Sequence, residues 1–81
     1  GSFYRHITSE LLRRGVPHTD LAGLRAVLPE LRFSTRLEGR SARMLIGGEP
    51  AGDEIRSAAV NEHVAHYAAV PEVREVLIGY Q

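Results

Sequence analysis

Apolar residues recur at helical spacing over the first third of the chain. Phe3, Ile7 and Leu11 lie four residues apart, which predicts an amphipathic helix over residues 2–14. A glycine and a Val-Pro pair then interrupt the pattern. A second, shorter helix is predicted over residues 19–27, because leucines form a stripe along one side and a proline follows its end.

Strict alternation of apolar and polar residues comes next. The run over residues 31–37 reads Leu-Arg-Phe-Ser-Thr-Arg-Leu, so one face of the predicted strand is apolar and the other is polar. A turn over residues 38–41 leads to a second alternating strand over residues 42–46. These strands predict a β-hairpin whose sheet is covered on one side only.

A helix and a strand are predicted for the rest of the chain. Pro50 suits the first turn of a helix that runs to about Ala69, and Asp53 and Glu54 favour its positive end. The apolar residues over 73–80 predict a closing strand. Because a helix joins the second strand to the third, we expect a crossover connection with parallel pairing.

These elements together predict an α+β fold. We expect a three-stranded mixed sheet with helices packed on one face, in the order α-(α)-β-β-α-β. Gly1 and Ser2 have the composition of a tag remnant, so residues 3–81 are expected to form one small domain, a module of a larger protein. The chain has no cysteine, which excludes disulfides and thiolate metal sites and leaves the compartment open between cytoplasm and periplasm.

The charges are unevenly distributed although the net charge is zero. Residues 1–48 hold eight arginines and four acidic residues, for a charge of +4, whereas residues 49–81 hold two arginines and six acidic residues, for a charge of −4. This split predicts docking on a protein partner, or head to tail on copies of the same chain. All ten basic residues are arginine, which indicates either the GC-rich codon usage of a bacterial genome or selection for bidentate anion binding.

The polar face of the predicted hairpin is the main candidate binding surface. It carries Arg32, Ser34, Arg36, Arg40 and Arg43, with Arg40 in the turn. Several guanidinium groups on one flat surface suit an acidic protein, an anionic lipid headgroup or nucleic-acid phosphate. No aromatic residue interleaves with them and the net charge is zero, which argues against a dedicated nucleic-acid binder. The alternative is a solvated face that protects the sheet from edge pairing.

His63 and His66 are the candidates for a metal site. They lie three residues apart on the predicted third helix, so both imidazoles are on one side of it. A metal site needs a third ligand, for which Glu62, His6 and His18 are the candidates. The alternative interpretation is a pair of surface histidines, and no metal or other cofactor is expected. The glycine-rich run over residues 47–52 lacks the lysine of a P-loop, and no catalytic triad is evident.

The chain from residue 31 onward resembles the BON domain. The resemblance rests on the first strand with its glycine turn (residues 31–39), the second strand that ends in glycine (residues 44–47), and the closing segment (residues 70–76). An amphipathic helix before the first strand also fits the α-β-β-α-β order of that family. The resemblance implies a non-catalytic module at the cell envelope that contacts phospholipid or partner proteins.

The sequence therefore predicts a non-catalytic interaction module that mediates protein–protein association or self-assembly within a larger protein. The alternatives are BON-like binding of anionic phospholipid at a membrane surface and binding of nucleic-acid phosphate through the arginine face. No enzymatic activity is expected.

Overall fold

The computed structural model describes residues 2–80, with side chains from Phe3 onward. Helix α1 (Ser2–Arg13) is followed by α2 (Leu21–Val27) and the short 3-10 helix η1 (Leu28–Glu30). Strands β1 (Phe33–Glu38), β2 (Ser41–Ile46) and β3 (Glu49–Pro50) come next. The 3-10 helix η2 (Asp53–Arg56), helix α3 (Ala58–Ala68) and helix α4 (Pro71–Tyr80) complete the order. The α+β class is confirmed, and the described residues form a three-stranded sheet as expected, although its third strand is not the predicted one.

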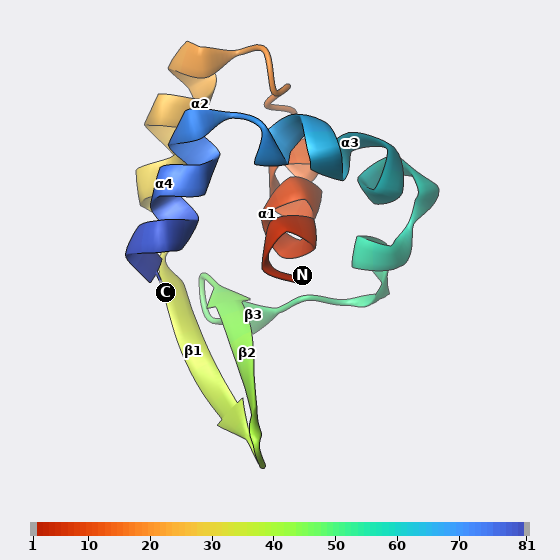
Figure 1. Cartoon of the computed structure of the whole chain (residues 1–81), viewed down its shortest axis with the longest axis vertical. Coiled ribbons are helices and arrows are strands. Elements are labelled where there is room, and N and C mark those ends of the chain that lie inside the picture. The colour runs from red at the N-terminus through yellow and green to blue at the C-terminus, as the bar shows by residue number, and fades with distance from the viewer. Residues whose placement is uncertain (1, 81) are drawn as a thin grey trace.

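The helices form one body from which the hairpin projects (Figure 1). Helix α1 packs against α3 and η2, while α2 packs against α4. Only the inner end of the hairpin enters this body. Met44 and Ile46 on β2 are buried there, with Phe33 of β1 on the same face. Leu37, farther along that face, is 78% exposed.

All strand pairing in the described residues is antiparallel, in the order β1-β2-β3. The predicted mixed sheet with a parallel third strand is therefore wrong. Gly47 and Gly48 both have positive φ angles, of 60° and 82°, which L-residues with side chains rarely adopt. These glycines turn the chain back at once, so β3 pairs with the end of β2 without a crossover helix.

The predicted closing strand is the helix α4, which is the largest correction to the predicted elements. Pro71 occupies its first position, where a missing N–H has no cost. Val73 and Leu77 lie four residues apart and are both buried against the core. Ile78, which an alternating strand would bury, is 72% exposed.

The third helix starts later than predicted. Gly52 and η2 precede it, and Ser57 caps α3 by accepting a hydrogen bond from the Val60 amide at 3.2 Å. Such a cap satisfies one of the free amides at the start of a helix and contributes about 1 kcal/mol. Asp53 and Glu54 therefore lie in η2, ahead of the helix.

The core lies between the helices and the inner end of the hairpin. Its most completely buried side chains are Ile7, Leu11, Leu24, Leu31, Tyr67, Val73 and Leu77. Burial of each large apolar side chain stabilises the fold by about 1.5–3 kcal/mol. None of the helices among residues 2–80 combines the length and the apolarity needed to cross a membrane.

Candidate functional site

One carboxylate joins the two arginines at the centre of the hairpin's polar face. Arg36 on β1 lies directly opposite Arg43 on β2. The Glu38 carboxylate pairs with Arg36 Nη2 at 3.2 Å and with Arg43 Nε at 3.0 Å. Like charges directly opposite in a sheet repel one another, and Glu38 offsets this repulsion. All three side chains are nearly half exposed, so solvent screens the pairs.

The other predicted binding residues lie apart from this pair. Ser34 is on the same face, and its carbonyl oxygen accepts a hydrogen bond from the Tyr80 hydroxyl at 3.1 Å. Arg32 has a φ of 51° and precedes the strand, whereas Arg40 lies in the turn at the far end. The structure thus brings Arg36 and Arg43 together and leaves Arg32 and Arg40 at opposite ends of the hairpin. Ligand binding by the five residues stays a prediction.

A groove of about 360 Å³, here called the first groove, lies between α1, β2 and η2. Its walls include Phe3 and His6 of α1, Ser41 and Arg43 of β2, and Asp53 and Arg56 of η2. Glu38 also reaches it. The lining of the first groove therefore combines guanidinium groups, carboxylates, a hydroxyl group and the aromatic ring of Phe3. Such a surface offers hydrogen-bond donors to an anion and acceptors to hydroxyl or amino groups.

Arg5 of α1 lies next to the first groove and connects α1 to η2 and α3. Its Nη1 donates to the Ile55 carbonyl oxygen at 3.1 Å and also to the Asn61 side-chain oxygen. These contacts place the Arg5 guanidinium beside the backbone that leads into Arg56. Within residues 2–80, neither Arg5 nor Arg56 forms an ion pair with a carboxylate. Their charges are therefore open to an anion from outside.

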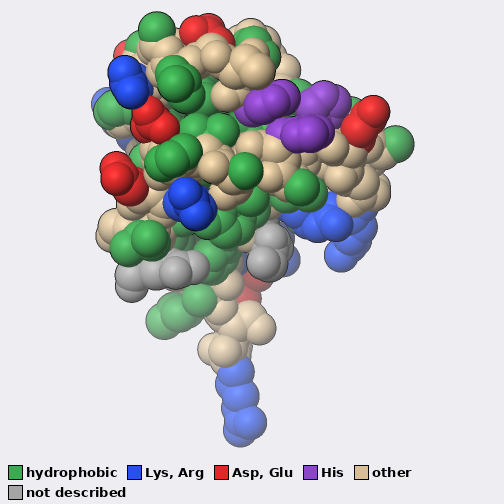
Figure 2. Space-filling model, turned by 45° about the horizontal axis from the view of Figure 1, so that its top comes forward, with side chains coloured by type: hydrophobic (Ala, Val, Ile, Leu, Met, Phe, Trp, Pro, Cys, Tyr) green, Lys and Arg blue, Asp and Glu red, His purple; other side chains and the backbone are tan. Residues whose placement is uncertain are grey.

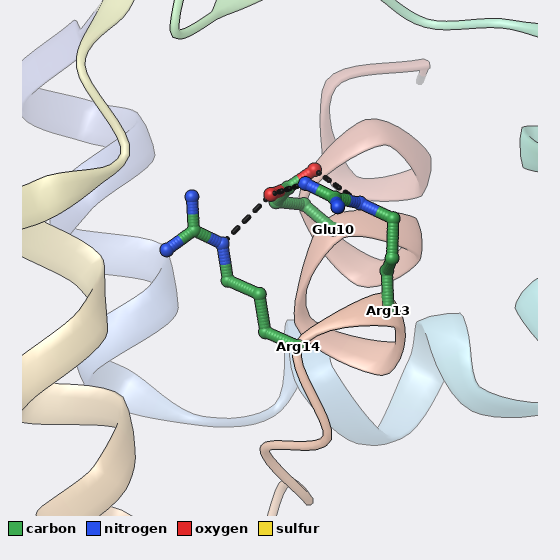
Figure 3. Close-up of polar contacts among 3 residues, drawn as sticks. All are labelled: Glu10, Arg13 and Arg14. Atoms are coloured by element: carbon green, nitrogen blue, oxygen red, sulfur yellow. Dashed lines mark hydrogen bonds and ion pairs between the residues drawn. The ribbon is translucent and has the colours of Figure 1, made fainter.

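A second groove, of about 480 Å³, lies on the other side of His6. It is lined by charged residues of α1 and by the turn that joins β2 to β3. In it, Glu10 accepts hydrogen bonds from Arg13 at 3.3 Å and from Arg14 at 2.7 Å (Figure 3). Burial alone raises the pKa of the Glu10 carboxyl, but the bonds from Arg14 and Arg13 outweigh burial and hold that pKa below its ordinary value. Both guanidiniums of this groove are paired with Glu10.

Three histidines meet on the surface away from both grooves, where Figure 2 shows imidazoles side by side. The His18 ring stacks on the His66 ring with centroids 4.8 Å apart, and His63 lies 6.3 Å from His66. The planes of the His18 and His66 rings are nearly parallel, at 14°, so nitrogen lone pairs that lie in these planes do not meet between the rings. In the part of the chain that the structure describes, no three His, Cys, Asp or Glu side chains are placed to hold a metal ion.

Comparison with known proteins gives a match over the whole chain. The family model described as cytidylate kinase matches residues 1–81. The cytidylate kinases of Rhodococcus jostii and Nocardia farcinica are 38% and 37% identical over 81 residues, which is all of this chain and 35% of each relative. The cytidylate kinase of Symbiobacterium thermophilum is 38% identical over 86 aligned residues, or 36% of its length. The chain thus spans about a third of the length of these relatives.

These matches correct three predictions. The resemblance to the BON domain is wrong. It rested on a pattern of apolar residues and glycines, whereas every residue of this chain is matched by the cytidylate kinase family. The prediction of a non-catalytic interaction module is wrong for the same reason, and so is the expectation of no enzymatic activity. Docking on a protein partner or on a second copy stays a prediction.

Proposed function

Because the chain belongs to the cytidylate kinase family, we propose that it is part of an enzyme that transfers a phosphoryl group to cytidylate. The observation that carries the proposal is the match over every residue of the chain, to relatives that bear this name. Since the chain spans about a third of those relatives, we assign the reaction to a longer polypeptide that contains these residues.

We assign these residues to the side of the enzyme that holds the acceptor nucleotide. Many phosphoryl-transfer enzymes hold the donor phosphates in a glycine-rich loop with a lysine. This sequence contains neither that motif nor any lysine. Its cations are arginines, whose planar guanidinium groups bind phosphate through two parallel hydrogen bonds.

The first groove has the chemistry that a cytidylate requires. Arg56 and Arg5 pair with no carboxylate among the described residues, so their guanidiniums are offered to the acceptor phosphate. Arg43 lines the same groove as Arg56. Carboxylates accept hydrogen bonds from ribose hydroxyls and from the exocyclic amino group of cytosine, and Glu38 and Asp53 supply them here. The volume of about 360 Å³ falls in the range of small-molecule sites, about 300–1,000 Å³.

Phosphoryl transfer needs little covalent chemistry from the protein. Catalysis comes from positioning of the two substrates and from stabilisation of charge on the transferred group. The contribution of this segment is therefore to orient the acceptor phosphate and to neutralise part of its charge.

The activity test uses the full-length protein that contains these residues. Release of nucleoside diphosphate is measured with ATP and with CMP, UMP, AMP or GMP as the acceptor. We expect turnover with CMP, with a kcat/KM well above that of the purine acceptors. A full-length protein that is folded but leaves CMP unphosphorylated contradicts the proposal.

The assignment of the groove is tested separately by charge removal. Arg56→Ser and Arg43→Ser are each expected to raise the KM for CMP about tenfold or more, since each removes a charge-assisted hydrogen bond. The matched control is Arg25→Ser. Arg25 lies on α2, pairs with Glu72 of α4, and is not part of the first groove. If the KM for CMP changes equally in all three variants, the acceptor lies elsewhere.

A further inference from the structure

The C-terminal end of α4 lies against the inner half of β1 and contacts it through Tyr80 (Figure 1). The Tyr80 hydroxyl donates a hydrogen bond to the Ser34 carbonyl oxygen at 3.1 Å, and it shares a second hydrogen bond with the Thr35 hydroxyl. A phenol has one proton to donate, so the Thr35 hydroxyl is the donor of the second bond. One side chain of α4 thus holds two adjacent residues of β1 that lie 46 and 45 positions earlier in the chain.

The ring of Tyr80 joins the same strand to α1. It meets the Phe3 ring edge-on, with centroids 5.5 Å apart and planes at 88°, and its centroid lies 6.0 Å from that of Phe33 on β1. Aromatic pairs at such distances stabilise a fold beyond the area that they bury. Phe3 also lines the first groove. Tyr80 therefore connects one wall of that groove to the strand that pairs with β2.

The hydrogen bonds of Tyr80 give the hairpin a directional contact. The buried side chains at the inner end of β2, Met44 and Ile46, are apolar, and Leu37 near the outer end of β1 is 78% exposed. Apolar burial has no preferred direction, whereas a hydrogen bond weakens steeply away from its preferred angle. The bonds to Ser34 and Thr35 therefore fix the angle at which the hairpin leaves the helices.

The angle of the hairpin determines where its polar groups lie in the first groove. Glu38, Ser41 and Arg43 of the hairpin line this groove together with Arg56 of η2. Glu38 lies three residues beyond Thr35, which is about 10 Å along a strand. A small rotation of β1 at Thr35 therefore becomes a larger displacement at the groove.

We propose that Tyr80 is a positioning residue for the acceptor nucleotide: through its hydrogen bonds to β1 and its ring contact with Phe3, it fixes the hairpin at the angle that places Arg43 and Ser41 in the first groove. The consequence for the reaction rests on the proposed function. The contact itself concerns only the position of the hairpin, and it can be measured independently of activity.

The kinetic test uses variants of the full-length protein. Tyr80→Phe keeps the ring and removes the hydroxyl, and Thr35→Val removes the partner hydroxyl at nearly the same shape. We expect each change to raise the KM for CMP about two- to tenfold, the range of one hydrogen bond, with the kcat and the KM for ATP within twofold. The double variant is expected to raise the KM for CMP by less than the product of the two single effects, because both changes remove the same bond.

A second measurement keeps this inference separate from the proposed function. Hydrogen exchange of the β1 amides is expected to speed up in Tyr80→Phe, and further in Tyr80→Leu, which also removes the ring, while the α3 amides exchange as before. This expectation holds whether or not CMP is phosphorylated. The matched control is Tyr4→Phe, which is expected to change neither the exchange nor the KM for CMP, because Tyr4 packs at the edge of the core and lines neither groove.

The outcomes separate the two proposals. A folded protein without activity toward CMP contradicts the proposed function alone, and the exchange of the β1 amides then decides on Tyr80. Unchanged β1 exchange in Tyr80→Leu, or an unchanged KM for CMP in both Tyr80 variants of an active protein, would overturn the positioning role.

Discussion

The buried hydroxyl of Tyr67 on α3 donates a hydrogen bond to the carbonyl oxygen of Val16, at 2.6 Å. Val16 lies just after α1, in the loop that the sequence marks by its Val-Pro pair. The His18 ring packs edge-on against the same tyrosine, with centroids 5.9 Å apart. One side chain of α3 thus fixes the path of the chain between α1 and α2.

Replacement of Tyr67 by phenylalanine is expected to lower the free energy of unfolding by about 1–3 kcal/mol. The change keeps the ring in the core but leaves the Val16 carbonyl oxygen buried without its donor. Urea denaturation followed by circular dichroism measures the effect. Tyr4→Phe is the control, because the Tyr4 side chain is only partly buried and packs at the edge of the core. Equal loss in both variants would show that the hydrogen bond is not the cause.

Thr8 on α1 has a fully buried hydroxyl that finds no hydrogen-bond partner among the described residues. An unpaired buried hydroxyl costs free energy, and valine has nearly the same shape without it. Thr8→Val is therefore expected to raise the free energy of unfolding by about 1 kcal/mol. Thr8→Ser, which keeps the hydroxyl and removes the methyl group, is expected to lower it. Thermal unfolding of the two variants measures both changes. A loss of stability in Thr8→Val would contradict the prediction and would show that the Thr8 hydroxyl has a hydrogen-bond partner, such as a bound water.

The elements that the sequence predicts correctly are those with one clear period. Apolar residues at four-residue steps fit only a helix at α1, and strict alternation fits only the strands of the β1-β2 hairpin. At α4 the apolar residues satisfy both periods. Val76, Ile78 and Tyr80 alternate as in a strand, whereas Val73 and Leu77 are spaced as in a helix. The helix forms because it buries Val73 and Leu77 in the core. The local sequence does not show where the core lies, so it cannot distinguish the helix from a strand.

The candidate site is less predictable than the fold. Arg5 reaches the backbone next to Arg56 because α1 packs on η2. The sequence around either residue does not predict this tertiary contact. Arg43 is found by alternation along β2, but its ion pair with Glu38 depends on the register of the hairpin. The family was missed because apolar spacing and glycine turns recur in unrelated folds.

The Glu10 carboxylate makes stability depend on pH in the acidic range. Its hydrogen bonds from Arg14 and Arg13 hold its pKa below 4.5 in the folded protein, despite the opposing effect of burial. The unfolded chain therefore binds more protons than the folded one in this range. This stabilisation is complete above about pH 4.5 and is lost as the pH falls through the folded pKa.

Glu10→Gln is accordingly expected to lower the free energy of unfolding by about 1 kcal/mol at pH 7 and by less at pH 3. Unfolding by urea at several pH values measures both the loss and its slope. The control is Glu62→Gln, an exposed residue outside this network. A loss in Glu10→Gln that is the same at pH 7 and pH 3 contradicts the assignment of the pH dependence to Glu10.

Arg5 provides the last test, because it separates charge from hydrogen-bond geometry near the acceptor. Its guanidinium bonds the Ile55 carbonyl and the Asn61 side chain, beside the backbone that leads into Arg56. Arg5→Lys keeps the positive charge but loses the planar fork that reaches two acceptors and an anion together. We expect this variant of the full-length protein to raise the KM for CMP about tenfold while the KM for ATP changes less than twofold. The conservative control is Arg25→Lys, where a lysine can still pair with Glu72. If Arg5→Lys behaves like Arg25→Lys, charge alone is sufficient at this position and the fork has no role in holding the acceptor.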